Sequence, residues 1–199
     1  QIMRHTLTAQ VLARAVKNLF PKAKLAIGPT IENGFYYDIL FEKKISIDDF
    51  PIIEKEMRRI ISSGSEIKKS FKTKKDSIKL FQERDESYKV DIINRSDQEE
   101  NFQIYQQGES EFIDLCHGPH LPNLKFIGAF KLTKLAGAYW KGDSKNEMLQ
   151  RIYGTAWLND KDLKTYLDML EESEKRDHRK IGKELNLFNM QEHAPGSVF

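Results

Sequence analysis

The sequence predicts an α+β fold, in which a mainly antiparallel sheet packs against helices and a long helix follows towards the C-terminus. Three observations predict it. Two segments near the N-terminus have apolar residues at the spacing of one helix face, and the middle of the chain carries short strand-like runs. The last third opens a long amphipathic segment. Because helices and strands do not alternate strictly, an antiparallel sheet is favoured over a parallel one.

The first two expected helices supply much of the apolar core. Apolar residues recur at helical spacing over residues 6–19, so the first helix is expected there. Thr6 or Thr8 would cap its start, and Pro21 lies just beyond its end. The second helix is expected over residues 48–64, because it opens with Asp-x-x-Pro and closes at a glycine.

The expected strands share β-branched or aromatic residues and are bounded by turn formers such as Gly-Pro and Asn-Gly. They are expected at residues 24–27, 34–39, 66–71, 89–93, 103–105, 112–115, 125–132, 138–141 and 149–153. A short helix is expected at 76–84. A long helix is expected from residue 159 or 160 to about 182, and its second half is almost all charged, which is typical of a connector that leaves the domain body.

Composition indicates an ordinary globular protein and argues against some classes. The 199 residues are 39% hydrophobic and 31% charged, with a net charge of +2. That balance is not typical of a general nucleic-acid-binding protein, although lysines cluster at 68–79 and basic residues at 175–183. The single cysteine excludes an internal disulfide, and no apolar run approaches the roughly 20 residues of a membrane span. We therefore expect a cytoplasmic protein without a membrane partner, and one cut from a longer chain, since it begins without Met.

Residues 114–120, Asp-Leu-Cys-His-Gly-Pro-His, concentrate the reactive side chains. The Gly-Pro pair predicts a turn, which would bring Cys116 and His120 to the same side of one loop. Asp114, two residues before Cys116 in an expected strand, would point to the same face. Three interpretations are open: half of a zinc site, a hydrolytic or acyl-transfer centre with His120 moving protons, and a loop with a small buried cysteine. On these residues alone the last is favoured.

Longer motifs together resemble bacterial threonyl-tRNA synthetase. The motifs lie at residues 24–38, 114–120, 136–143 and 148–157, with 175–183 similar to the linker helix and 192–199 to the start of the catalytic core. The resemblance implies three parts. Residues 1–157 would form the editing domain, residues 158–185 the linker helix, and residues 186–199 the beginning of the aminoacylation core.

The resemblance also implies an activity, which is hydrolysis of the ester of seryl-tRNA(Thr) with water as the nucleophile. Serine lacks one methyl group of threonine, which changes binding by only about 1–3 kcal/mol, so the synthetic site alone discriminates too weakly. The implied partners are the 3′ end of tRNA(Thr) and the rest of the synthetase chain, which would dimerise through its core. No cofactor is implied for this segment; ATP, magnesium and a zinc would belong to the catalytic core of the full-length enzyme.

Five residues acquire roles from the resemblance. Lys89 would lie beside the scissile ester, where its charge could polarise the carbonyl or orient water. Asp114 would hold the seryl amino group or a water. His120 would position water or relay a proton, and Cys116 would shape the small side-chain pocket. Tyr37 would line the pocket.

Two residues depart from the family pattern. Thr6 and Gln10 stand where the family has a pair of histidines one helical turn apart, and His5 is one residue off register. One residue is a rotation of about 100°, so His5 would replace Thr6 only if the helix start unwinds. Cys116 and His120 alone are too few ligands, so no metal is expected. Thr6 and Gln10 stay as substrate-binding candidates, and the alternative function is a tRNA acceptor-end binding module with decayed editing.

Further contacts with tRNA are expected at two places. Phe35 or Tyr37 would stack or pack against the terminal adenosine, and lysines of the 68–79 cluster would contact phosphates. His117, where the family often has arginine, is expected to be a loop residue. A free-standing deacylase is disfavoured, because residues 192–199 are similar to the synthetase core.

Overall fold

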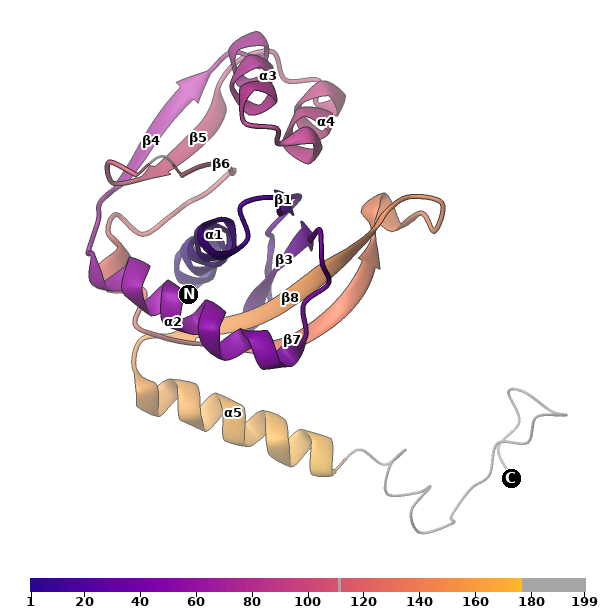
Figure 1. Ribbon diagram of the computed structural model, residues 1–199. Helices are drawn as coiled ribbons and strands as arrows, with labels where there is room; N and C mark the ends of the chain where they lie inside the picture. Colours follow the sequence, from indigo (N-terminus) through magenta and orange to yellow (C-terminus); the bar gives the residue numbers. More distant parts are fainter. Residues whose placement is uncertain (111, 177–199) are drawn as a thin grey trace, which may run out of the picture. The chain divides into compact units, whose positions relative to one another are not determined.

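The computed structural model describes residues 1–110 and 112–176 of the chain (Figure 1). The chain forms two compact units, residues 1–160 and residues 161–199. The described residues of the first unit form two sheets and four α-helices, with three short 3₁₀ helices. Of the second, the structure describes most of helix α5 (Asp160–Lys175), as expected from the sequence. The expected continuation of this helix to about residue 182, and the segment 186–199, lie outside the described residues.

The larger sheet holds the N-terminal strands and the two longest strands of the chain. Its path is β1-β3-β8-β7, and β2 pairs with the first residues of β3. All its pairings are antiparallel, and Tyr37 of β3 lies opposite Ile152 of β8. The strands are β1 (Lys24–Leu25), β2 (Thr30–Ile31), β3 (Gly34–Leu40), β7 (Ala129–Tyr139) and β8 (Met148–Trp157).

The smaller sheet is built from the middle of the chain and is covered by two helices. It has the order β4-β5-β6 and places Asp114 of β6 opposite Tyr105 of β5. Its strands are β4 (Ile67–Lys72), β5 (Phe102–Gln107) and β6 (Ile113–Leu115), and its helices are α3 (Lys74–Glu83) and α4 (Ser87–Arg95). Phe81 of α3 and Ile93 of α4 form one buried cluster with apolar side chains of β5.

Helix α1 (Ile2–Leu19) lies between the two sheets (Figure 1). Almost all its side chains from His5 to Val16 are buried, and several are alanines, which allow neighbouring elements to approach closely. It packs against β3, β8 and helix α2 (Phe50–Ser62), and Arg14 reaches the other sheet through a 3.3 Å hydrogen bond to Gln107. The helix thus forms the core of the larger layer together with α2 and makes a polar contact with the smaller sheet.

The expected α+β class and the antiparallel pairing are confirmed, but the strands form two sheets rather than one. The strand expected over residues 89–93 is wrong, because this segment lies inside helix α4. Its run of Val90, Ile92 and Ile93 favours a strand by local propensity. In the fold, Val90 and Ile93 are three residues apart and both pack towards the smaller core, so tertiary packing selects the helix.

Three smaller expectations also need correction. Helix α1 begins at Ile2, so Thr6 and Thr8 are interior residues, and their hydroxyls donate to the carbonyls of Ile2 and Arg4. The strand expected at 125–132 begins only at Ala129, after a 3₁₀ turn, and the piece expected at 138–141 continues the same strand to Tyr139. Within the described residues no helix combines the length and the apolar character needed to cross a membrane.

Candidate active site

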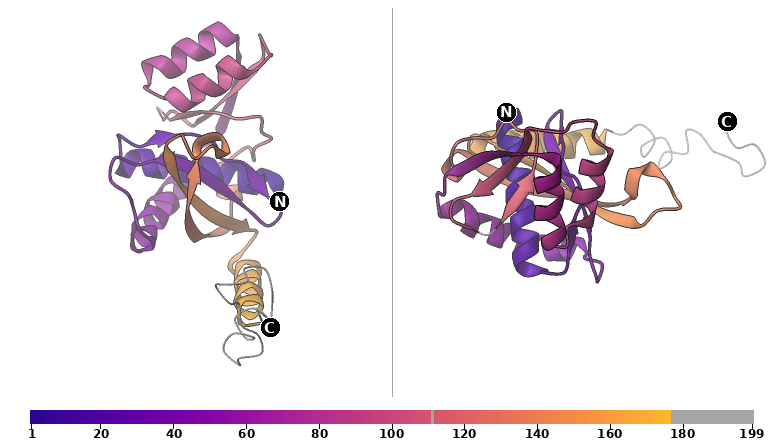
Figure 2. Two further views of the ribbon diagram at one scale, coloured as in Figure 1. Left: turned by 90° about the vertical axis from the view of Figure 1, so that its right-hand side faces the viewer. Right: turned by 90° about the horizontal axis from the view of Figure 1, so that it is seen from above.

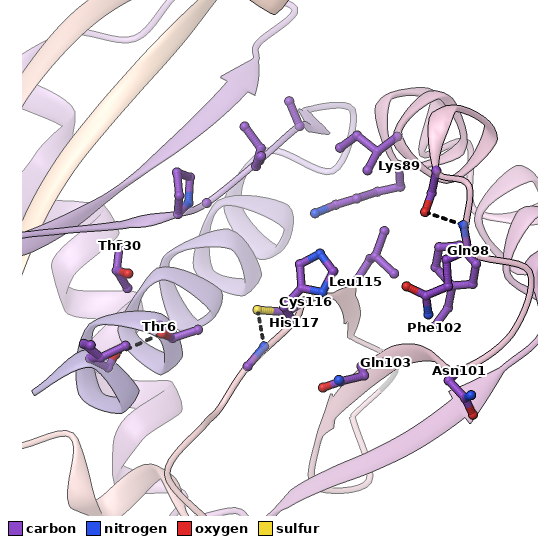
Figure 3. Close-up of a pocket in the computed structure, with 18 residues that line it drawn as sticks. Thr6, Thr30, Lys89, Gln98, Asn101, Phe102, Gln103, Leu115, Cys116 and His117 are labelled. Atoms are coloured by element: carbon purple, nitrogen blue, oxygen red, sulfur yellow. Dashed lines mark hydrogen bonds between the residues drawn. The ribbon is translucent and has the colours of Figure 1, made fainter.

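A pocket of about 380 Å³ opens where the two layers meet (Figure 3). Its walls come from the start of α1, the chain between β1 and β2, helix α4, the loop before β5, and the loop after β6. Lys89 reaches into it from one side, and Thr6 and Thr30 lie on the other, with Cys116 and His117 between them (Figure 3). The pocket therefore combines an apolar lining with a few polar groups that converge, as ligand sites do.

Three buried polar side chains meet behind this pocket, each from a different element. The ammonium of Lys89 on α4 is 2.6 Å from one carboxylate oxygen of Asp114 on β6 and donates to the hydroxyl of Tyr37 on β3 at 2.9 Å. The Tyr37 hydroxyl donates in turn to the other Asp114 oxygen at 3.0 Å. All three side chains are at most 4% exposed. We call Lys89, Asp114 and Tyr37 the buried triad.

The triad fixes the direction of its side chains and keeps Tyr37 neutral. Burial, followed by the Asp114 charge, raises the pKa of Tyr37 well above its ordinary value, so the phenol stays neutral. A lysine ammonium has three N–H donors; Lys89 donates one to Tyr37 and forms an ion pair with the Asp114 carboxylate at 2.6 Å, without a regular hydrogen bond to that oxygen. Because Lys89 also lines the pocket, an N–H that Tyr37 does not use is available to an oxygen bound there.

The chain between β1 and β2 packs closely against Tyr37 of the triad. Gly28 lines the pocket, and a side chain on it would collide with the Tyr37 ring. Tyr37 thus supports the pocket wall from behind rather than facing the cavity. Phe35 is completely buried in the apolar core, so its ring is not available to stack on a nucleoside.

The loop after β6 makes the expected turn, with a cis bond between Gly118 and Pro119. Gly118 has φ 65°, and a side chain there would collide with the Tyr105 hydroxyl. Cys116 lines the pocket and accepts the Gly118 N–H at 3.4 Å. Burial raises the pKa of the Cys116 thiol, so it stays protonated and is neither a thiolate nucleophile nor a ready metal ligand at neutral pH.

His120 lies on the same loop and packs against Tyr105, with ring centroids 4.1 Å apart. Burial, with a smaller contribution from Lys69, lowers the pKa of His120 to about 4, against the opposing charge of Asp114. Both ring nitrogens are buried without a hydrogen-bond partner among the described residues. The imidazole is therefore neutral at physiological pH and has free capacity to accept or donate a proton. The described residues that line the pocket include Cys116 and His117 but not His120.

Thr6 and Gln10, which stand where the family has histidines, differ in their surroundings. Thr6 lines the pocket, but its hydroxyl is used by the carbonyl of Ile2 at 2.9 Å. Gln10 is 2% exposed, and neither atom of its amide has a partner in the described part of the chain. His5 does not replace Thr6, since its Nε2 lies 3.1 Å from the Ala156 carbonyl of the larger sheet, and the helix is regular from Ile2.

Sequence reasoning missed part of the pocket wall. His117 is a loop residue, as expected, but it also lines the pocket, as do Gln98, Asn101 and Gln103 from the segment before and within β5. No sequence motif marks Gln98, Asn101 or Gln103, and His117 is marked only by its place in the 114–120 motif. Among residues 1–110 and 112–176, no group of three or more His, Cys, Asp or Glu side chains is close enough together to hold a metal ion.

A protein-family model matches part of the chain that forms this site. Residues 103–153 match the family model described as "Threonyl and Alanyl tRNA synthetase second additional domain". The matched segment runs from β5 into β8 and contains Asp114, Cys116 and His120.

The whole chain is also similar to curated threonine–tRNA ligases. It is 54% identical over 199 residues to that of Hahella chejuensis, 56% identical over 198 residues to that of Marinobacter nauticus, and 52% identical over 198 residues to that of Psychrobacter arcticus. Each match covers 100% of this chain but only 31%, 30% and 30% of the relatives. The resemblance read from the sequence is thereby confirmed: the chain belongs to the bacterial threonyl-tRNA synthetase family and corresponds to the part of those enzymes that contains this domain.

Proposed function

We propose that this domain hydrolyses the ester of seryl-tRNA(Thr), with water as the nucleophile. The observation that carries the proposal is the buried triad, which holds a lysine ammonium at the wall of a pocket with one N–H free for a substrate oxygen. A fully buried lysine is costly unless it is paired, and the fold provides that pairing at this one face of the cavity. Such an arrangement suits the stabilisation of an ester carbonyl that becomes an oxyanion.

The reaction assigns a role to each triad member. Water oxygen adds to the seryl carbonyl carbon, and Lys89 donates an N–H that Tyr37 does not use to the carbonyl oxygen as negative charge develops there. The bond from carbon to the ribose oxygen then breaks, and the ribose oxygen takes up the proton that the water gave up. Asp114 and Tyr37 hold the ammonium in place at the pocket wall through the ion pair and the hydrogen bond.

His120 is the proposed carrier of that proton. The imidazole is unprotonated at neutral pH and so free to accept a proton from water and return it to the leaving oxygen, and its pKa of about 4 makes it a weak base for this step. Because His120 does not line the pocket, this transfer needs an intervening water at its unpartnered ring nitrogens. Cys116 is a neutral, compact wall residue that limits the size of the side chain the pocket accepts.

A second function, a tRNA acceptor-end binding module with decayed editing, is favoured by one specific observation. At the two departures, the Thr6 hydroxyl is occupied by the helix backbone and the Gln10 amide is buried without a partner among the described residues. Neither group is thus set to move a proton. A pocket of this shape would still bind the single-stranded 3′ end of tRNA through its polar groups.

The activity of the whole synthetase is a wider proposal, since the chain spans about a third of its relatives. In that proposal the full-length enzyme uses ATP, magnesium and a zinc in its catalytic core, dimerises through that core, and works in the cytoplasm on tRNA(Thr). This segment would contribute the ester hydrolysis and would need no cofactor of its own.

The test is single-turnover deacylation of seryl-tRNA(Thr) and threonyl-tRNA(Thr) by the purified chain, with His120→Ala as a comparison. We expect the seryl ester to be hydrolysed well above its spontaneous rate, the threonyl ester to be spared, and the His120→Ala variant to be impaired. A folded chain that binds tRNA but leaves the seryl ester at its spontaneous rate would contradict the hydrolase and leave the binding module as the function.

A further inference from the structure

Helix α4 divides its side chains among three neighbours. Lys89 and Ile92, three residues apart, line the pocket, while Ile93 packs into the core of the smaller sheet. Tyr88 and Asp91, also three residues apart, face the far end of the β7–β8 hairpin. The helix that carries the triad lysine is therefore held by both layers of the domain.

The contacts to the hairpin are specific and of three kinds. The Tyr88 ring packs edge-on against Trp140 with centroids 4.8 Å apart, and its hydroxyl donates to the Glu147 carboxylate. Asp91 forms an ion pair with Lys141 at 2.7 Å, and the hydrogen bond from Lys141 lowers the pKa of Asp91. We call these five residues the hairpin clamp. The hairpin that carries three of them extends beyond the rest of the larger sheet (Figure 2).

The turn between β7 and β8, where the hairpin meets α4, contains two residues with positive φ. Lys141 has φ 61° and ψ 15°, in the left-handed region that a residue with a side chain seldom adopts, and Gly142 follows with φ 72°. Such a conformation persists only where surrounding contacts hold it. Here the Lys141 side chain is held by Asp91 of α4.

We propose that the hairpin clamp is a positioning device for the catalytic lysine, which deepens and rests on the proposed hydrolase function. Lys89 lies directly after Tyr88 and two residues before Asp91, so its Cα cannot shift without disturbing the clamp. The ammonium must reach Tyr37 on the larger sheet and Asp114 on the smaller sheet at 2.9 and 2.6 Å. The clamp ties the lysine's helix to the larger sheet, and so sets both distances at once.

The kinetic test uses a double variant, Tyr88→Phe with Asp91→Asn, which removes both polar contacts of the clamp from the α4 side without touching the pocket. We expect its kcat for deacylation of seryl-tRNA(Thr) to fall about tenfold, because a small misplacement of a reacting group lowers rates strongly. Its KM should stay within about twofold. The matched control is Arg95→Gln, which removes another 3.3 Å ion pair of Asp91 that does not involve the hairpin, and it should react as the wild type does.

A background without the lysine separates positioning from a general loss of structure. In Lys89→Met, the clamp variant should lower the residual rate no further, since its effect acts through Lys89. An equal loss in both backgrounds would overturn the proposal, as would an unchanged kcat in the clamp variant. With Tyr88 unchanged, Asp91→Glu keeps the charge that pairs with Lys141, so its kcat should return towards the wild-type value.

A readout without activity keeps this inference distinct from the proposed function. Reductive methylation with ¹³C-formaldehyde, with the Lys89 signal identified by its absence in Lys89→Arg, measures how well the amine is held and protected. We expect slow labelling in the wild type and in Arg95→Gln, and labelling several-fold faster in the clamp variant. If the chain does not deacylate seryl-tRNA(Thr), the hydrolase proposal is wrong. Faster labelling of Lys89 in the clamp variant would still support the positioning role of the hairpin clamp. Equal labelling in all three proteins would overturn it.

Discussion

Two buried carboxylates in this domain are neutralised in opposite ways. Glu54 of α2 is 3% exposed, but its cations, Arg58 and Lys131, keep 59% and 46% of their side chains in solvent. Asp114 is paired with Lys89, and both are only 4% exposed. A buried carboxylate that needs only stability can use cations at the surface, which lose little hydration. Burying the cation as well is more costly, and the domain does it beside its pocket.

The Glu54 group also explains a backbone feature. Its carboxylate accepts the Leu132 N–H at 3.0 Å, next to the register shift between Leu132 and Lys134 in β7. It therefore satisfies an N–H donor at an irregular point of the strand. No comparable backbone group depends on the Lys89 ammonium among the described contacts, which use only the Tyr37 hydroxyl and the Asp114 carboxylate. The comparison thus assigns Glu54 to the fold and Lys89 to the pocket.

The largest expected effect comes from breaking the triad pair. Lys89→Met leaves the Asp114 charge buried without its cation, so the free energy of unfolding should fall by about 3–5 kcal/mol. Adding Asp114→Asn removes that charge and should recover most of the loss in a denaturant titration. Deacylation should stay lost in both variants. Recovery of activity with stability would mean that the pair serves only the fold.

The second effect is a dependence of stability on pH that comes from His120. Burial lowers the folded-state pKa of His120 to about 4, below the ordinary value of 6.5, so below pH 6.5 the unfolded state binds a proton that the folded state resists. The stability from this neutral imidazole is present above pH 6.5 and is lost as pH falls towards 4, by up to about 3 kcal/mol. His120→Asn should flatten the pH profile of unfolding over this window. The same slope in the variant would assign it to another group, such as His5, whose pKa burial also lowers.

The third effect tests the fold side of the comparison. Glu54→Gln removes the charge that neutralises Arg58 and Lys131 and weakens the bond to the Leu132 N–H. The free energy of unfolding should fall by about 1–3 kcal/mol. Deacylation at a temperature where the variant is folded should be unchanged. A loss of activity in the folded variant would erase the distinction between the two carboxylates.

The smallest effect concerns Gln10. A buried amide without partners costs stability, so Gln10→Leu, which has nearly the same shape, should raise the free energy of unfolding by about 1 kcal/mol. Thermal unfolding measures this directly, with Gln106→Leu as a control, whose amide donates to the Ser110 carbonyl. A loss of stability in Gln10→Leu would mean that the amide binds ordered water beside the site.

Much of the fold could be predicted from the sequence, and the exceptions have physical causes. Periodicity over residues 6–19 and 48–64 predicts α1 and α2, because apolar spacing reports directly on burial. The 89–93 segment failed because its β-branched residues favour a strand locally, while the contacts that stabilise α4 come from β5 and the hairpin, which are distant in the sequence.

The site shows the same division. The turn over 114–120 follows from Gly-Pro, and the resemblance placed Lys89, Asp114 and Tyr37 in one site, which the structure brings within 3.0 Å of one another. The sequence did not reveal that His117 lines the pocket, because side-chain direction on a loop has no periodic signal. The burial of Phe35 on strand β3 depends on its packing in the core with α1, which is a tertiary contact. The contacts of the hairpin clamp depend on side chains about 50 residues apart, and no local pattern reports them.

The central claim, that the buried Lys89 ammonium serves ester hydrolysis, is tested most directly by deacylation of seryl-tRNA(Thr) with Lys89→Met/Asp114→Asn, in which the buried charges are removed together. The matched control is Lys22→Met, which removes a surface lysine that lies outside both the pocket and the 68–79 cluster. The account predicts that the double variant folds, binds tRNA(Thr) and hydrolyses the seryl ester about 10²–10³-fold more slowly than the wild type and the control. A folded double variant with wild-type deacylation would contradict it.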